Sequence, residues 1–148
     1  MKPTGVLTME SGALRREIAE RLGYRMTIEE FDGGEMDYVL KDPNGEWKKI
    51  CSPLIEPTEN AAWAYALAHD DVNPPVCPNW PEDDAAALAL CAEEARRLCC
   101  ELELEWWPEP GCRAAFRQGG VFLYGGDGET TALALSRLAL EALRARSE

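Results

Sequence analysis

The sequence lacks the long apolar runs of a membrane protein and has a single histidine, His69, among its 148 residues. A membrane-spanning helix needs about 20 consecutive apolar residues, and the opening residues also lack the apolar stretch of a signal peptide. We therefore expect a cytoplasmic protein that does not bind membranes. His69 closes an alanine-rich segment, a position that favours interaction with a helix dipole over catalysis.

Positive charge is also scarce, since 15 Lys and Arg stand against 27 Asp and Glu and give a formal net charge of −12 at pH 7. Proteins that bind nucleic acid directly carry a basic stripe, so we expect no direct contact with nucleic acid. Disorder is excluded, because the chain is 46% hydrophobic. The length is that of one globular domain, which predicts a single domain over 1–148 that begins with a flexible leader over 1–10.

The six cysteines show no Cys-x-x-Cys spacing. Zinc sites and redox-active cysteines need such a spacing, and a thiol nucleophile needs a nearby base that a chain with one histidine hardly supplies. The cysteines are therefore expected to be reduced and mostly buried. We expect no catalytic residues, no metal and no cofactor, and a hydrolase or nuclease is the least favoured class of function.

Hydrophobic periodicity and turn residues predict strands grouped between helices. The expected helices cover 11–22, 58–69, 81–100 and 131–146, and the expected strands cover 24–31, 36–41, 46–51, 101–106, 112–117 and 121–124. The short helix at 58–69, capped by Thr58, belongs to a proline-rich insert over 52–80. This pattern indicates an α+β domain in the order α-βββ-(short α)-α-βββ-α, with helices packed on antiparallel meander sheets in a layered α/β/α-type sandwich.

Two of the expected helices carry a clear apolar face. In 81–100 the face consists of Leu88, Cys91, Ala95 and Leu98, and in 131–146 it consists of Leu135, Leu138, Ala139 and Ala142. Leu133 and Leu140 lie on the opposite side of the last helix, which is therefore apolar on two sides. These two leucines are either covered within the domain or form the interface of a homodimer.

Three segments of the chain resemble a known family. The run 78–88 leads into an alanine-rich helix, an aromatic-rich hairpin follows, and the Thr-capped run 129–140 is rich in Ala and Leu. With the opening run 13–23, this order resembles the phage ABA sandwich family of small tailed-phage and prophage proteins, although Pro81 stands where a capping Ser or Thr is expected. The resemblance covers residues 10–146 and carries no catalytic motif. It implies a non-enzymatic accessory protein of the host cytoplasm, with counter-defence by sequestering a nucleotide-type ligand or masking a host factor as its expected function.

The strand 101–106 alternates glutamates with apolar residues, so its carboxylates lie on one face about 6.8 Å apart. In the expected hairpin register Glu101 lies opposite Arg117. Glu105 then lies opposite Arg113. Cross-strand ion pairs explain this row without any ligand and are the favoured interpretation. The alternative is a free acidic row that imitates nucleic-acid phosphates and inhibits a host enzyme that binds DNA or RNA.

Alternation places Trp106 in the core and Trp107 on the opposite face, beside Arg113. An exposed tryptophan next to an arginine is suited to bind a base, a nucleotide or a partner protein. The candidate residues for binding a ligand or partner are Trp107, Arg113, Arg117 and Tyr124.

Overall fold

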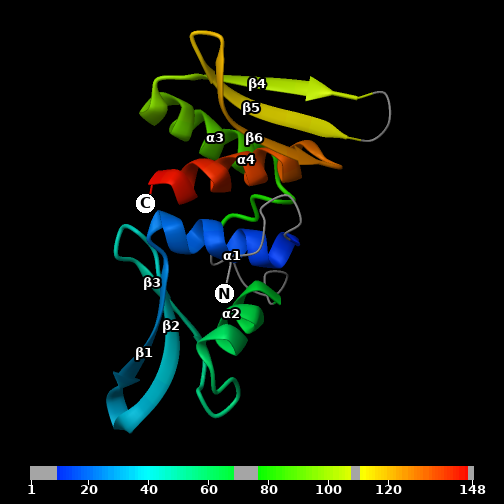
Figure 1. Ribbon diagram of the computed structural model, residues 1–148. Helices are drawn as coiled ribbons and strands as arrows, with labels where there is room; N and C mark the ends of the chain where they lie inside the picture. The colour runs from blue at the N-terminus through cyan, green and yellow to red at the C-terminus, as the bar shows by residue number, and fades with distance from the viewer. Residues whose placement is uncertain (1–9, 69–76, 108–110, 147–148) are drawn as a thin grey trace. The chain divides into compact units, whose positions relative to one another are not determined.

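The computed structural model describes residues 10–68, 77–107 and 111–146 of the chain (Figure 1). It is an α+β protein whose helices and two three-stranded antiparallel sheets follow the order α-βββ-α-α-βββ-α, which confirms the predicted class and layout. The chain forms two compact units. Unit 1 comprises Met1–Arg21 and Pro78–Glu148, and unit 2 comprises Leu22–Cys77. The single domain over 1–148 and the flexible leader stay predictions, since residues 1–9 lie outside the described part.

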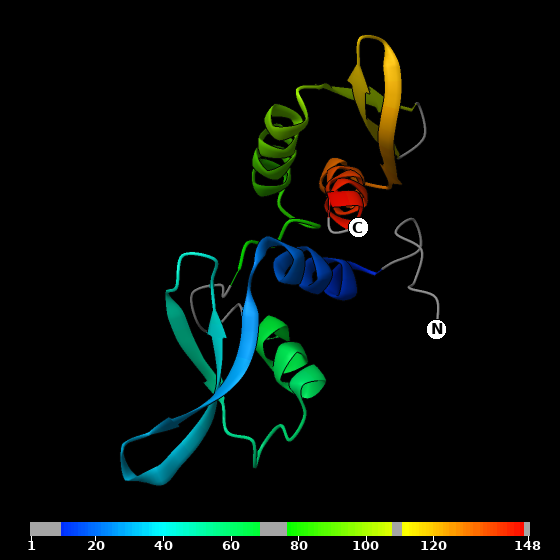
Figure 2. The ribbon, with the colours of Figure 1, turned by 60° about the vertical axis from the view of Figure 1, so that its left-hand side comes forward.

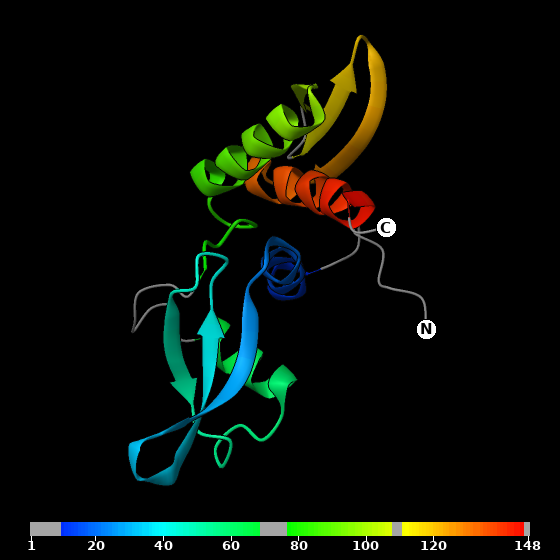
Figure 3. The same cartoon turned by 90° about the vertical axis from the view of Figure 1, so that its left-hand side faces the viewer.

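Unit 1 has a sheet with two helices on one of its faces (Figures 1 and 3). Its elements are α1 (Ser11–Leu22), α3 (Asp84–Leu98), β4 (Glu101–Trp106), β5 (Cys112–Gln118), β6 (Val121–Gly128) and α4 (Thr131–Arg146). The strand order is β4-β5-β6, and α3 and α4 pack on the same face of this sheet. We call the face turned away from these helices the outer face; among the described residues no helix covers it.

The helix α4 is the central element of unit 1. The four residues of its predicted apolar face are all buried (Leu135, Leu138, Ala139 and Ala142). Its backbone approaches β6 closely because Gly126 has no side chain: a Cβ there would lie 2.6 Å from the carbonyl oxygen of Ala134. The Cys91 thiol of α3 donates a hydrogen bond of 3.1 Å to the carbonyl oxygen of Leu135.

The second apolar side of α4 is covered within the chain at Leu140, which has no exposed surface. Leu133 is half-buried. Leu140 therefore cannot form an interface between two copies of the chain, because α4 is already covered on this side. A homodimer stays a prediction, without Leu140 in its contact surface.

The helix α3 begins and ends differently from the expectation over 81–100. Asp83 is its N-cap, and the side chain accepts a hydrogen bond of 3.1 Å from the N–H of Ala86. The predicted apolar face is wrong at Leu88, which is 47% exposed. The buried face consists of Ala87, Leu90, Cys91, Glu94 and Ala95. The hydrophobic pattern of the sequence did not predict this face, because one of its buried residues, Glu94, is charged.

That charged member, Glu94, forms ion pairs with arginines of two helices. Its carboxylate lies 2.6 Å from Nη2 of Arg97 on α3 and 3.1 Å from Nη1 of Arg146 on α4. A buried carboxylate is tolerated only when it is paired in this way. The pair with Arg146 thus joins the ends of α3 and α4.

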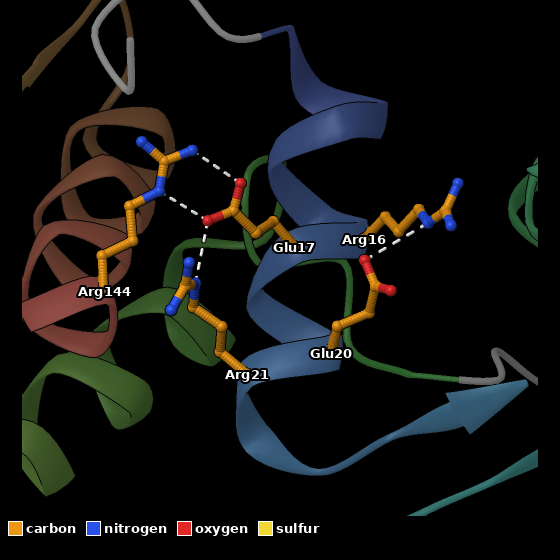
Figure 4. A network of polar contacts seen from close by, with 5 residues as sticks. All are labelled: Arg16, Glu17, Glu20, Arg21 and Arg144. Atoms are coloured by element: carbon orange, nitrogen blue, oxygen red, sulfur yellow. Dashed lines mark hydrogen bonds and ion pairs between the residues drawn. The ribbon is translucent and has the colours of Figure 1, made fainter. Parts of the chain in front are cut away.

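The helix α1 is joined to α4 by a second group of ion pairs (Figure 4). Glu17 accepts two hydrogen bonds from Arg144, from Nε at 2.5 Å and from Nη2 at 2.6 Å. Arg21 donates a third from its Nε at 2.9 Å. These bonds lower the pKa of Glu17 below its usual value, and those from Arg144 have the largest effect. On the other side of α1, Arg16 pairs with Glu20 at 3.3 Å.

Unit 2 is a meander with one helix against it (Figure 2). Its elements are β1 (Arg25–Phe31), the short 3₁₀ turn η2 (Asp32–Gly34), β2 (Glu35–Lys41), β3 (Trp47–Cys51) and α2 (Glu59–Ala68). The turn between β2 and β3 contains Gly45 at φ 91°, a conformation that favours glycine. Thr58 caps α2 as predicted, because its Oγ1 accepts the N–H of Ala61 at 3.1 Å. His69, expected at the end of this helix, lies outside the described residues.

Candidate functional site

The candidate site lies on the outer face of the unit 1 sheet. The register of β4 and β5 places Glu101 opposite Arg117 and Glu105 opposite Arg113, which confirms the predicted hairpin register. Alternation therefore brings charged side chains of neighbouring strands together on this face. Its charged members are Glu101, Glu103, Glu105, Arg113, Arg117 and Asp127.

The predicted ion-pair partners on this face are wrong, although the register is right. Arg117 pairs with the diagonal Glu103, with its Nε 2.8 Å from the carboxylate. Arg113 pairs with Asp127 of β6 at 3.0 Å. The reason is that β5 is the central strand of the sheet. Each of its arginines is therefore within reach of carboxylates on both neighbouring strands, at directly opposite and at diagonal positions. Within the part of the chain that the structure describes, Glu101 forms no ion pair.

Two aromatic rings accompany the two arginines. The guanidinium carbon of Arg113 lies 5.6 Å from the ring centroid of Trp107, and that of Arg117 lies 5.9 Å from the ring of Phe122. Both distances are within the range of cation–π attraction. The hydrogen bond to Asp127 raises the pKa of Arg113 above its usual value, so this guanidinium stays charged at any ordinary pH. The expected proximity of Trp107 and Arg113 is thus present.

The position of Trp107 is defined by its contacts with Gly111. The N–H of Trp107 donates a hydrogen bond of 3.2 Å to the carbonyl oxygen of Gly111. A Cβ on Gly111 would lie 2.9 Å from Cζ3 of the indole, so the ring lies directly over the glycine. The indole is nevertheless 40% exposed and accessible to a ligand.

Tyr124, proposed from the sequence as a fourth binding residue, is not part of this group. It pairs with the buried Phe116 in the register of β5 and β6, so it lies on the helix-facing side of the sheet. Phe122 occupies the outer face instead. The register shift between Phe116 and Arg117 places Phe122 and Tyr124 on opposite faces, although strict alternation would put both on the same face.

Trp106 also differs from the prediction, which placed it in the core. It is 61% exposed, and its indole N–H donates a hydrogen bond of 3.1 Å to Oγ1 of Thr131. It faces the same side as the buried Cys112, but it is the last residue of an edge strand. A residue at that corner has a neighbouring strand on one side only, and this leaves much of the ring uncovered.

A small cavity of about 250 Å³ opens on the outer face. Its walls are Arg113, Phe122 and Asp127, with Gly125 and Gly126 between them. A Cβ on Gly125 would lie 2.9 Å from Cζ of Phe122, so the missing side chain is what allows the ring to lie there. Whole ligands of drug size occupy about 300–1,000 Å³. The cavity is therefore suited to one ring of a ligand whose remainder lies on the open face.

The charge of the outer face limits the ligand further. Four carboxylates (Glu101, Glu103, Glu105 and Asp127) against two guanidinium groups (Arg113 and Arg117) give a local charge of 2 − 4 = −2. Each added negative charge on a ligand about 7 Å away is disfavoured by about 1 kcal/mol even at the dielectric constant of water. The face is therefore suited to aromatic ligands of low negative charge.

Two other cavities have a different character. One of about 880 Å³ lies at the starts of α3 and α4 and is lined by acidic residues, among them Glu82, Asp83 and Asp84. The other, about 730 Å³, lies in unit 2 beside the exposed apolar side chains of Met36 and Leu54. Neither contains an aromatic ring next to an arginine.

Two kinds of reactive group bear on catalysis in the described residues, cysteine thiols and metal-binding clusters. Cys51, Cys77, Cys91 and Cys112 are buried free thiols. Burial raises the pKa of Cys91 to about 12, which leaves no thiolate near neutral pH. No group of three or more His, Cys, Asp or Glu in the described ranges is arranged to hold a metal ion. Likewise, none of the described helices has the length and apolar character to cross a membrane.

Comparisons with protein-family models, with curated proteins and with solved structures find no match for this chain. The resemblance to the phage ABA sandwich family therefore stays a prediction.

Proposed function

We propose that the chain acts by binding, and that the outer face of the unit 1 sheet takes a ligand of nucleotide type. The observation that carries the proposal is the pairing of Arg113 with Trp107, and of Arg117 with Phe122, on a face where Arg113 and Phe122 also line a cavity of about 250 Å³. A base placed in the cavity contacts the ring of Phe122. The exposed indole of Trp107 is available for the rest of the ligand. Stacking of one base on an aromatic side chain contributes about 1–3 kcal/mol.

The negative charge of the face decides among such ligands. Arg113 and Arg117 each already contact a carboxylate, so they have limited capacity for further anions. Nucleosides and cyclic nucleotide monophosphates are therefore favoured over nucleoside triphosphates. Such a preference supports sequestration of a nucleotide signal more than binding of a metabolic nucleotide triphosphate.

Isothermal titration calorimetry with adenosine, cyclic adenosine monophosphate and adenosine triphosphate tests this proposal. We expect the triphosphate to bind most weakly at low salt, and Phe122→Ala to weaken binding of the other two about tenfold or more. Trp47→Ala is the matched control, because Trp47 is a 56% exposed aromatic residue on β3 of unit 2. No binding of any of the three, or equal effects of both variants, would contradict the proposal.

The biological setting that we propose follows from the resemblance. A phage or prophage accessory protein that works in the host cytoplasm would use such a site in counter-defence, either by sequestering a nucleotide signal or by masking a host factor.

A second candidate is an acidic inhibitor that occupies the nucleic-acid site of a host enzyme. The observation that favours it is that Glu101 and Glu105 form no ion pair within the described residues, so part of the carboxylate row is displayed freely. Its test is whether the chain competes with DNA or RNA for such an enzyme. Glu101→Gln with Glu105→Gln should then remove the competition, whereas Trp107→Ala should not.

A further inference from the structure

The free edge of β4 is open along the whole strand. In the order β4-β5-β6 only one side of β4 has a neighbour, and the pairing with β5 runs from Glu101 to Trp106 without a bulge. Figure 1 shows β4 at the margin of the sheet, with no described strand along its other side. Such an edge presents unpaired N–H and C=O groups over about 20 Å for a strand of this length. An extended chain with compatible side chains can extend the sheet there.

The outer-face side chains of β4 select for positive charge. Glu101, Glu103 and Glu105 project from this face at every second residue. Arg117 contacts Glu103, whereas Glu101 and Glu105 have no ion-pair partner among the described residues. In an added strand the side chains beside these carboxylates also recur at every second residue, so Lys or Arg at alternate positions complements the row.

The opposite side chains of β4 select for apolar residues. Leu102 and Leu104 are half-buried, and Trp106 is 61% exposed. The indole of Trp106 is held by its hydrogen bond to Thr131, so it offers a fixed and largely exposed apolar surface on this side of β4. The side chains of an added strand that point to this face would contact these three residues. The two faces together select an alternating basic and apolar sequence.

The same pattern disfavours pairing with a second copy of β4. Two such strands side by side would place glutamates next to glutamates, and like charges in neighbouring strands are destabilising. The other edge of this sheet, β6, is a poorer template, since it contains Gly125, Gly126 and Gly128 and pairs with β5 through a register shift. The open edge of β4 is thus a better template for an added strand than β6, and its charge favours a basic segment over a second copy of β4.

We propose that β4 is a docking strand for an extended segment of a partner protein in which Lys or Arg alternate with apolar residues. The partner adds a strand to the sheet of unit 1, with its basic side chains on the outer face beside Glu101 and Glu105. This inference goes beyond the proposed ligand site and does not depend on it, because it uses the edge of β4 and not Arg113 or Trp107.

The test uses the full chain and three synthetic peptides of about seven residues. The first alternates Lys and Val, the second has the same composition with the lysines grouped together, and the third repeats the first with N-methyl groups on alternate amides. We expect the alternating peptide to bind and to slow hydrogen exchange at the β4 amides that face the free edge. The grouped and N-methylated peptides should bind at least about tenfold more weakly, because they lose side-chain matching or backbone hydrogen bonds.

Variants of the chain separate this proposal from the ligand site. Glu101→Gln and Glu105→Gln should each weaken the alternating peptide about two- to fivefold at low salt. Glu93→Gln is the matched control on α3, since Glu93 is 75% exposed and ion-paired. Phe122→Ala on β6 should weaken nucleoside binding and leave peptide binding unchanged. Absence of binding by the alternating peptide, equal binding of its N-methylated form, or unchanged exchange in β4 would overturn the proposal.

Discussion

Cys99 ends α3 in a conformation that favours glycine. Its φ of 55° and ψ of 46° place it in the left-handed region, and it is the only non-glycine residue with positive φ in the described ranges. A side chain in this conformation is disfavoured, whereas glycine adopts it freely. We expect Cys99→Gly to stabilise the protein by about 0.5–1 kcal/mol in urea unfolding under reducing conditions.

The control for this prediction is Cys99→Ala, which removes the thiol but keeps the Cβ. Alanine has the same difficulty with positive φ, so its free energy of unfolding should stay close to that of the parent protein. An equal gain from both substitutions would assign the effect to loss of the exposed thiol instead of to the backbone.

Single residues of the candidate site were predictable only where the strands are regular. Alternation and the hairpin register placed Trp107 beside Arg113 correctly, since β4 and β5 pair without interruption. Tyr124 was a wrong candidate and Phe122 was missed, because the register shift between β5 and β6 places these two residues on opposite faces of the sheet. Trp106 was misplaced for another reason: alternation says which face a residue is on, but not whether anything covers that face.

At the scale of elements, the packing of α4 on β6 depends on glycine. A Cβ at Gly126 would lie 2.6 Å from the carbonyl oxygen of Ala134, which belongs to the backbone of α4 and cannot move without shifting the helix. We expect Gly126→Ala to destabilise the protein by about 1–3 kcal/mol in chemical unfolding. Gly12→Ala in α1 is the control, because a Cβ there meets nothing within 4 Å. Alanine in an exposed helix should instead stabilise by about 0.5–1 kcal/mol.

Elements were predictable to the extent that their signals are local. Periodicity gave the bounds of α1, β4 and α4 as the structure has them, and the hydroxyl of Thr58 caps α2 as expected. The start of α3 was misjudged because Asp83 caps it, two residues after the proline taken as its beginning. Its buried face was also misjudged, since burial of Glu94 depends on arginines and one of them, Arg146, lies in another helix. Such long-range pairs leave no local trace in the sequence.

At the scale of the whole chain, the order of helices and strands followed from turn residues and periodicity, but the contacts that join distant segments did not. Glu17 and Arg144 are 127 positions apart, and nothing in either local sequence identifies them as partners. Both are surface-type residues on amphipathic helices. Their pairing depends on the tertiary structure of unit 1, which brings α1 and α4 together (Figure 4).

This pair makes the stability of the fold depend on pH. The hydrogen bonds from Arg144 lower the pKa of Glu17 in the folded state below the usual value of 4.5. The stabilisation is therefore fully present above about pH 5 and is lost as the pH falls through the lowered pKa of the folded state. We expect Glu17→Gln to lower the free energy of unfolding by about 1–2 kcal/mol at pH 7 and to flatten its decline between pH 5 and pH 3.

Urea unfolding followed by circular dichroism across that pH range measures both effects. Glu20→Gln is the matched control, because Glu20 lies on the same helix in a more exposed pair with Arg16. That variant should keep the pH profile of the parent protein and lose less than about 0.5 kcal/mol. If the two variants have the same profile, the contact between Glu17 and Arg144 does not contribute to folding and α1 is held to α4 by its apolar residues alone.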